Sequence, residues 1–170
     1  MRIIKKNGFS LIQLIIVISI LSILASYVFP KFMSLSRNSK ISVLKSVKGK
    51  INTVVYMVKS AARLNGLSKV SSNPSGRGGN QSSFIIKTNI GTFEVDWRNL
   101  CPESKAELGD KLELPDFLNI STNLKTRVNN QYTAIGFTLP SSLPGNSGCY
   151  VLYDSFGFPD CTVNIIDDQC

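Results

Sequence analysis

The chain has 170 residues, a formal net charge of +8 and no histidine. This length suits one modest domain with an appendage. Without histidine the chain lacks the side chain most used for acid–base catalysis near neutral pH and for binding metals, so the composition argues against a hydrolase or a metalloenzyme. We therefore expect no enzyme activity, no catalytic residue and no metal site.

The charge is distributed unevenly along the chain. Residues 1–93 contain 14 Lys and Arg and no acidic residue, whereas residues 94–170 contain 5 Lys and Arg and all 11 acidic residues. Such a split indicates an anionic partner for the basic half, or like molecules that pack basic part against acidic part, or simply a solvated polar face.

An apolar segment, residues 11–29, opens the chain and is interrupted only by Gln13 and three serines. As a helix it would span about 28 Å, close to the hydrocarbon thickness of a bilayer. The preceding Arg2, Lys5 and Lys6 place the N-terminus in the cytoplasm by the positive-inside rule. A cleaved secretory signal, a plain membrane anchor and a processed membrane helix all fit. The stretch ILASYVFPKF that follows has no clean A-x-A cleavage site for the first of these.

The residues around Gly8 carry a motif. The stretch KKNGFSLIQ, residues 5–13, resembles the processing site of type IV pilins and pseudopilins: a short basic leader ending in Gly, then Phe, Ser or Thr, Leu, Ile and usually Glu, followed by a long apolar run. Pro30 lies where pilins often carry a helix-loosening proline, and residues 29–66 resemble the same stretch of MSHA-type pilins. The resemblance is specific for residues 5–67 and thin beyond them.

This resemblance implies that a prepilin peptidase cuts between Gly8 and Phe9 and methylates the new amine of Phe9. It implies a type IV pilin fold of class α+β, in which a long N-terminal helix packs its second half on a small antiparallel sheet. The expected divisions are a leader (1–8), a transmembrane and filament-core helix (9–30), an amphipathic helix (31–67) and a β-rich head (68–170). The expected location is the inner membrane, with a periplasmic head, and then an extracellular pilus.

The function that the resemblance implies is that of a structural subunit, major or minor, of an MSHA-like type IV pilus serving adhesion or motility. Its partners would be the prepilin peptidase, other pilin subunits, inner-membrane lipid, and the assembly platform with its ATPase. A type II secretion pseudopilin and a DNA-binding minor pilin are the alternatives. Trp97 is the only tryptophan and no aromatic and basic platform recurs, so we do not expect a nucleic-acid partner.

Gln13 departs from the family pattern. Most pilins carry Glu there, which is thought to neutralise the terminal amine of a neighbouring subunit inside an apolar bundle, where an unpaired charge is costly. Gln has the same shape without the charge. Gln13 then marks a minor subunit at a tip, or a filament that tolerates an amide, or a variation without consequence. With Pro30, where we expect a kink or local melting, it is our candidate assembly residue.

Beyond Pro30 the apolar residues follow helical spacing. They form a stripe expected to face the head: Leu44, Val47, Ile51, Val54, Val58 and Ala61, widened by Ile41, Val55 and Ala62. The rest of the circumference is basic and expected to face outward: Lys40, Lys45, Lys48, Lys50, Lys59 and Arg63. Asn65-Gly66 predicts the end of the helix, because Gly tolerates the left-handed capping conformation.

The head begins with a loop over residues 68–83, rich in Ser, Gly and Asn. Alternating and β-branched residues between turn residues predict an antiparallel sheet. The predicted strands are Phe84–Thr88, Thr92–Val95, Tyr132–Leu139, Cys149–Tyr153 and Thr162–Ile166, the last two forming a hairpin. Residues 101–112 are predicted as a short helix with Glu103, Lys105 and Glu107 exposed.

All four cysteines lie in the last 70 residues, which indicates one or two disulfides in an oxidising compartment. Four cysteines allow three pairings. The pilin resemblance favours a bridge from the chain end to an earlier strand, hence Cys149–Cys170, leaving Cys101–Cys161. No cofactor is expected. Calcium in the C-terminal loop is the alternative to ordinary turn chemistry for four aspartates: Asp154, Asp160, Asp167 and Asp168.

Overall fold

The computed structural model describes residues 10–74, 76, 82–88, 91–107 and 111–170. The chain divides into two compact units, residues 1–39 and residues 40–170. A single helix, α1 (Leu11–Leu64), begins in the first unit and ends in the second. The local melting expected at Pro30 is not present, because the residues on both sides of this proline are helical. Pro30 removes one backbone hydrogen bond, and the neighbouring turns keep the helical conformation.

The end of α1 lies where the sequence predicts it. Gly66 has a φ of 80°, in the left-handed region. The N–H of Gly66 donates to the carbonyl of Arg63 (3.0 Å), and the N–H of Leu67 donates to the carbonyl of Ala62 (3.0 Å). These two bonds form a Schellman motif, which satisfies carbonyls that have no partner within the helix. Leu67 then packs on the apolar core next to Ala62, which fixes the direction in which the chain leaves.

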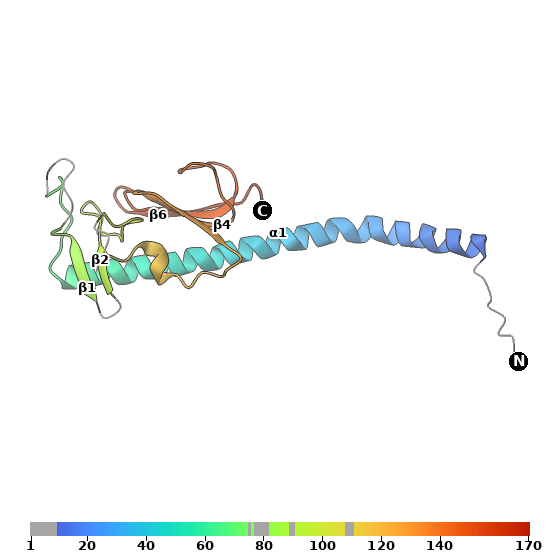
Figure 1. The fold of residues 1–170 in the computed structure, drawn as a ribbon, viewed down its shortest axis with the longest axis horizontal. Coiled ribbons are helices and arrows are strands. Elements are labelled where there is room, and N and C mark those ends of the chain that lie inside the picture. The colour runs from blue at the N-terminus through green and yellow to red at the C-terminus, as the bar shows by residue number, and fades with distance from the viewer. Residues whose placement is uncertain (1–9, 75, 77–81, 89–90, 108–110) are drawn as a thin grey trace, which may run out of the picture. The chain divides into compact units, whose positions relative to one another are not determined.

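A four-stranded antiparallel sheet covers the buried stripe of α1 in the second unit (Figure 1). Its spatial order is β3 (Lys125–Val128), β4 (Tyr132–Thr138), β5 (Cys149–Asp154) and β6 (Thr162–Ile166). Ile135, Val151 and Tyr153 on this sheet pack against Leu44, Val47, Ile51 and Val55 on the helix. This is the larger of the two clusters of the core.

A hairpin, β1 (Ile85–Thr88) with β2 (Gly91–Glu94), covers the last turns of α1. Ile86, Phe93 and Val95 pack with Val58 and Ala62. The hairpin and the four-stranded sheet are separate sheets, and each depends on the same helix for its apolar contacts. The chain is therefore α+β, as expected from the sequence.

Two parts of the head differ from the sequence prediction. Residues 101–107 are not helical; they form a bridge between Val95 and Pro102, and the short 3-10 helix η1 (Leu114–Phe117) comes later. Glu103 is consequently buried and not exposed, because its N–H donates to the carbonyl of Glu94 in the neighbouring strand. Lys105 and Glu107 are exposed as predicted.

The strand β3 was not predicted. Its residues are mostly exposed and polar, as suits an edge strand, so the alternation that marks a half-buried strand is absent. The one sequence feature that could have indicated β3 is the turn that follows it. Asn129 accepts hydrogen bonds on its side chain from the N–H groups of Gln131 and Tyr132, a local turn geometry that asparagine favours.

Gly49 within α1 and Gly66 in its C-terminal cap should respond oppositely to alanine. Gly66→Ala forces a Cβ into the left-handed conformation and should lower the free energy of unfolding of the head by about 1 kcal/mol. A Cβ added at Gly49 would meet no other atom within 4 Å, so Gly49→Ala should raise that free energy by about 0.5–1 kcal/mol. Thermal unfolding of the full chain in detergent, followed by circular dichroism, measures both. Equal shifts in one direction would contradict the assignment of the cap.

Candidate functional site

The part of α1 in the first unit presents an exposed apolar surface. Every large apolar side chain from Leu11 to Leu35 is exposed, by between 46% and 77% of its area. By length and composition this helix could cross a membrane. Soluble proteins rarely expose contiguous apolar surface on this scale, so the surface needs lipid or other protein chains to cover it.

The polar side chains within this surface bond to the helix itself. The hydroxyl groups of Ser19, Ser22 and Ser26 donate to the carbonyl oxygens of residues three or four positions earlier, at 2.7–2.8 Å. In an apolar environment an unsatisfied hydroxyl costs free energy, and these bonds avoid that cost. The helix can therefore enter lipid or an apolar bundle despite its serines.

The side chain of Gln13 takes part in capping the N-terminus of α1. Ser10 is the residue before α1, and its carbonyl accepts a bond from the N–H of Leu14 (3.2 Å). The N–H of Ser10 donates to Oε1 of Gln13 (3.1 Å). This is half of a capping box, in which a Glu or Gln three residues into the helix satisfies the N–H of the capping residue. The expected cleavage and methylation residues, Gly8 and Phe9, lie outside the described residues.

The two disulfides expected from the pilin resemblance are both present in the head, Cys101–Cys161 and Cys149–Cys170. The first joins the segment after β2 to the residue before β6, and the second joins β5 to residue 170. No cysteine among the described residues is free.

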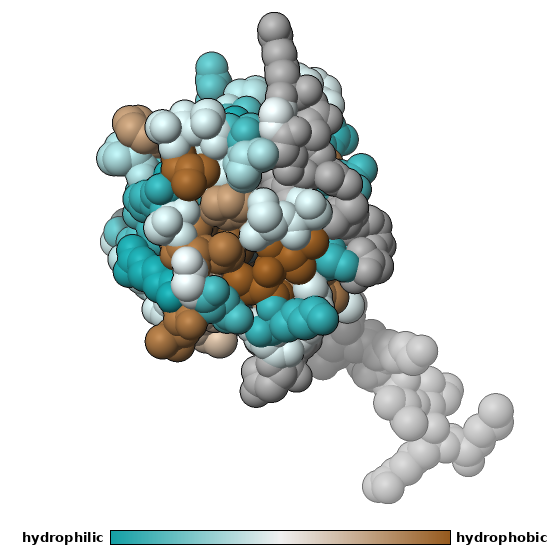
Figure 2. Space-filling view, turned by 90° about the vertical axis from the view of Figure 1, so that its left-hand side faces the viewer, coloured by the Kyte–Doolittle hydropathy of each residue, from teal (hydrophilic) through white to brown (hydrophobic). Residues whose placement is uncertain are grey.

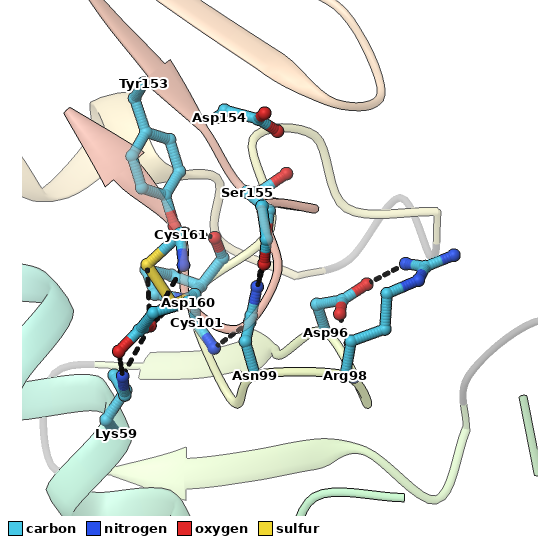
Figure 3. The surroundings of a disulfide bond; sticks show 12 residues. Lys59, Asp96, Arg98, Asn99, Cys101, Tyr153, Asp154, Ser155, Asp160 and Cys161 are labelled. Carbon is cyan, nitrogen blue, oxygen red and sulfur yellow. Dashed lines mark hydrogen bonds and ion pairs between the residues drawn. A yellow bond between two sulfur atoms is a disulfide. The ribbon is translucent and has the colours of Figure 1, made fainter. Parts of the chain in front are cut away.

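An ion pair lies against the first disulfide (Figure 3). Nζ of Lys59, from α1, is 2.5 Å from Oδ2 of Asp160, in the loop between β5 and β6. The Lys59 side chain is only 9% exposed and the Asp160 side chain 50% exposed. Oδ1 of Asp160 lies 3.2 Å from Sγ of Cys101. Helix, loop and disulfide therefore meet at one point of the head.

Lys59 was expected on the outward basic face, and this expectation was wrong. A signal for its position was present, since Lys59 follows Val55 by four residues and precedes Ala62 by three, on one edge of the apolar stripe. Two further lysines of that face bond within the head: Lys40 donates to the carbonyl of Cys170 (2.9 Å) and Lys50 to that of Asn119 (3.0 Å). Much of the basic face thus serves the fold.

A turn after β2 holds the loop between β5 and β6 from its other side (Figure 3). Nδ2 of Asn99 donates to the carbonyls of Ser155 (2.8 Å) and Gly157 (2.9 Å), and its Oδ1 accepts from the N–H of Cys101 (2.8 Å). Asn99 is fully buried, and its bonds to Ser155 and Cys101 are shielded from water.

Arg98, in the same turn, also contacts the loop between β5 and β6, through the ring of Phe156. Its guanidinium pairs with the buried carboxylate of Asp96 at 2.5 Å and lies 4.2 Å from the ring centre of Trp97 and 4.8 Å from that of Phe156. Burial raises the pKa of the Asp96 carboxyl above its ordinary value of 3.8, an effect that the hydrogen bond from the Arg98 N–H and the Arg98 charge only partly oppose.

The aspartates considered for calcium have different partners. Asp160 pairs with Lys59, Asp154 accepts from Gln131, and Asp168 accepts from the N–H of Gly148 (2.7 Å) and the hydroxyl of Ser147. These bonds lower the pKa of the Asp168 carboxyl. Among the described residues, one group has the spacing of metal ligands, Cys101, Asp160 and Cys161. Its sulfur atoms form a disulfide, and thiolates are what a thiophilic metal requires.

Comparison of the chain with protein-family models, with curated proteins and with solved structures finds no match. What stands is a chain of class α+β with one long apolar N-terminal helix, antiparallel sheets and two disulfides.

Removing Asp160 from the Lys59–Asp160 pair should destabilise the head more than removing the charge of Lys59. Asp160→Ala leaves a buried ammonium without its partner and should lower the free energy of unfolding by about 2 kcal/mol. Lys59→Met keeps the apolar stem and leaves a half-exposed carboxylate to water, so it should change that free energy by less than about 1 kcal/mol. Urea unfolding of both variants tests the order, and a greater loss for Lys59→Met would contradict it.

The raised pKa of Asp96 predicts that the stability of the head depends on pH. Because the folded pKa of this carboxyl is raised, the folded head binds its proton more tightly than the unfolded chain does. The stability that wild type has relative to Asp96→Asn should therefore increase as the pH falls from 7 towards 3.8. Urea unfolding of both proteins at about pH 7, 5 and 4 measures the difference. A difference that is constant or shrinks with falling pH would show that burial does not dominate at this site.

Proposed function

We propose that this chain is a structural subunit, major or minor, of an MSHA-like type IV pilus. The observation that carries the proposal is the first part of α1: an exposed apolar helix, led by the KKNGFSLIQ motif, in which the hydroxyls of Ser19, Ser22 and Ser26 bond to the helix's own carbonyls. Such a surface is suited to two apolar environments in turn, lipid before assembly and neighbouring helices afterwards.

The head is suited to the outside of the inner membrane. Two disulfides persist in an oxidising compartment and limit the unfolded alternatives of a small domain. The three basic residues before the apolar segment support a cytoplasmic N-terminus, which puts the head in the periplasm and, after assembly, on the pilus surface.

Gln13 acts within its own chain in this proposal. Its Oε1 accepts from the N–H of Ser10, so it holds the first turn of the helix that would follow the new N-terminus at Phe9. It brings no charge to neutralise an amine of a neighbouring subunit. Its amide is also less costly than a carboxylate to hold in lipid.

Processing tests the proposal directly. In cells with the assembly machinery, the mature chain should begin at an N-methylated Phe9, as read by mass spectrometry of the N-terminal peptide. Gly8→Val should leave only the precursor, because a Cβ and its branches hinder the extended backbone in a protease cleft. Immunogold labelling of the head should then decorate surface filaments in wild type and none in Gly8→Val cells. Filaments confined to the periplasm would indicate a secretion pseudopilus instead.

Gln13→Glu is the matched variant. Glu can accept the same bond from the N–H of Ser10, so cleavage after Gly8 should be unchanged and only incorporation into filaments should differ. An unshifted precursor band in Gln13→Glu would refute this separation of processing from assembly.

A further inference from the structure

The head has an apolar groove that the fold leaves open. It lies between the last turns of α1, the hairpin and η1, and it has a volume of about 710 Å³. Its helix wall includes Met57, Ala61 and Leu64, and the stacked rings of Phe93 and Phe117, 4.2 Å apart, form part of the opposite wall. Figure 2 shows apolar side chains gathered in the middle of this end of the head, with hydrophilic ones around them.

The groove continues into exposed apolar surface, as a docking surface does and an enclosed ligand cavity does not. Tyr56, Met57 and Leu64 on its helix wall are 72%, 54% and 89% exposed. Outside the groove, Phe158 at 84% is the one large apolar side chain of the described part of the head that is more than half exposed. The described part of the head thus has an apolar groove and, outside it, a large apolar side chain that projects from the surface.

The projection is held in place. Phe158 belongs to residues 155–160, which we call the Phe158 loop. Lys69 donates to the carbonyl of Pro159 (3.0 Å), Lys59 pairs with Asp160, and Asn99 donates to the carbonyls of Ser155 and Gly157. A side chain presented by a fixed loop loses little conformational freedom when it binds.

Groove and loop lie on different sides of α1, so one copy cannot fill its own groove. Successive helical residues are about 100° apart, which puts Lys59, where the Phe158 loop is bound, about 200° from Met57 and Ala61 in the groove. A contact between a loop on one side and a groove on the other is heterologous, and repeating it generates a ring or an open helical array and not a closed dimer.

The charge next to Phe158 is already compensated within its own copy. Asp160 of the loop pairs with Lys59, and Lys69 donates to the carbonyl of Pro159. On the η1 wall of the groove, Asp116 already accepts from the N–H of Glu113 (2.8 Å). Phe158 can therefore enter an apolar groove of a second copy without carrying an unpaired charge into it, which would be costly.

We propose that the groove binds the Phe158 loop of a second copy of this chain. The proposal rests on the filament function above and names a contact between heads that would accompany packing of the helices. Phe158 of the second copy enters between Met57, Leu64 and Phe117 of the first copy.

Photo-crosslinking in cells tests the contact. Ser60 lines the groove and is exposed, so p-benzoylphenylalanine in its place samples whatever occupies the groove of the full-length chain. Irradiation should give a product of twice the subunit mass, with the cross-link in residues 155–160 of the second copy. The same residue in place of Ser42, exposed on α1 about 27 Å away, is the matched control and should give no cross-link to that loop. Phe158→Ser should reduce the product about tenfold, whereas Phe158→Leu, which keeps an apolar side chain, should retain most of it.

Electron microscopy of the same cells separates this contact from the filament function. Filaments without a cross-link to residues 155–160 overturn the contact and leave the function standing. A cross-link without filaments supports the contact between copies and overturns the filament function. Neither filaments nor product overturns both. A cross-link from position 60 to another protein, to lipid, or to a different part of the second copy overturns the contact, and its mass identifies the real occupant.

Discussion

The apolar stripe on the second half of α1 is the constraint on which the head depends. Leu44, Val47, Ile51 and Val55 fill the cluster beneath the four-stranded sheet, and Val58 with Ala62 fills the cluster beneath the hairpin. The two sheets share no paired strands, so the helix is the common support for their apolar faces. A two-stranded hairpin is marginal in water without such a partner. The Lys59–Asp160 pair then joins the helix to the loop between β5 and β6, and the Cys101–Cys161 disulfide joins that loop to the segment after β2.

The regular elements could be predicted because their residues follow one periodicity each. Three- and four-residue spacing defines the stripe of α1, and β-branched and aromatic runs define five of the six strands, to within a residue or so at each end. The Asn65-Gly66 stop is local chemistry and was also predicted correctly. The pairing of the cysteines followed from the family resemblance, since four cysteines alone leave three choices.

The parts that could not be predicted depend on contacts between distant residues. Lys59 is buried because Asp160, 101 residues later, meets it, and Glu103 is buried because its backbone pairs with β2. The polar edge strand β3 forms because its backbone pairs with that of β4, and the hydrophobicity pattern of its own residues does not indicate a strand. The groove and the Phe158 loop belong to this class as well, because each is formed by segments that only the tertiary fold brings together.

The order of the disulfides along the chain has a mechanical consequence. Cys149 lies within the 60-residue interval closed by Cys101–Cys161, and its partner Cys170 lies beyond it, so the two covalent loops overlap. Tension applied between the helix and the C-terminal hairpin would reach Cys101 and cross directly to Cys161. The bypassed interval would otherwise extend by about 200 Å. A subunit loaded along this path can therefore lengthen in the segment between α1 and Cys101, whereas the interval from Cys101 to Cys161 stays closed and most of the four-stranded sheet carries none of the load.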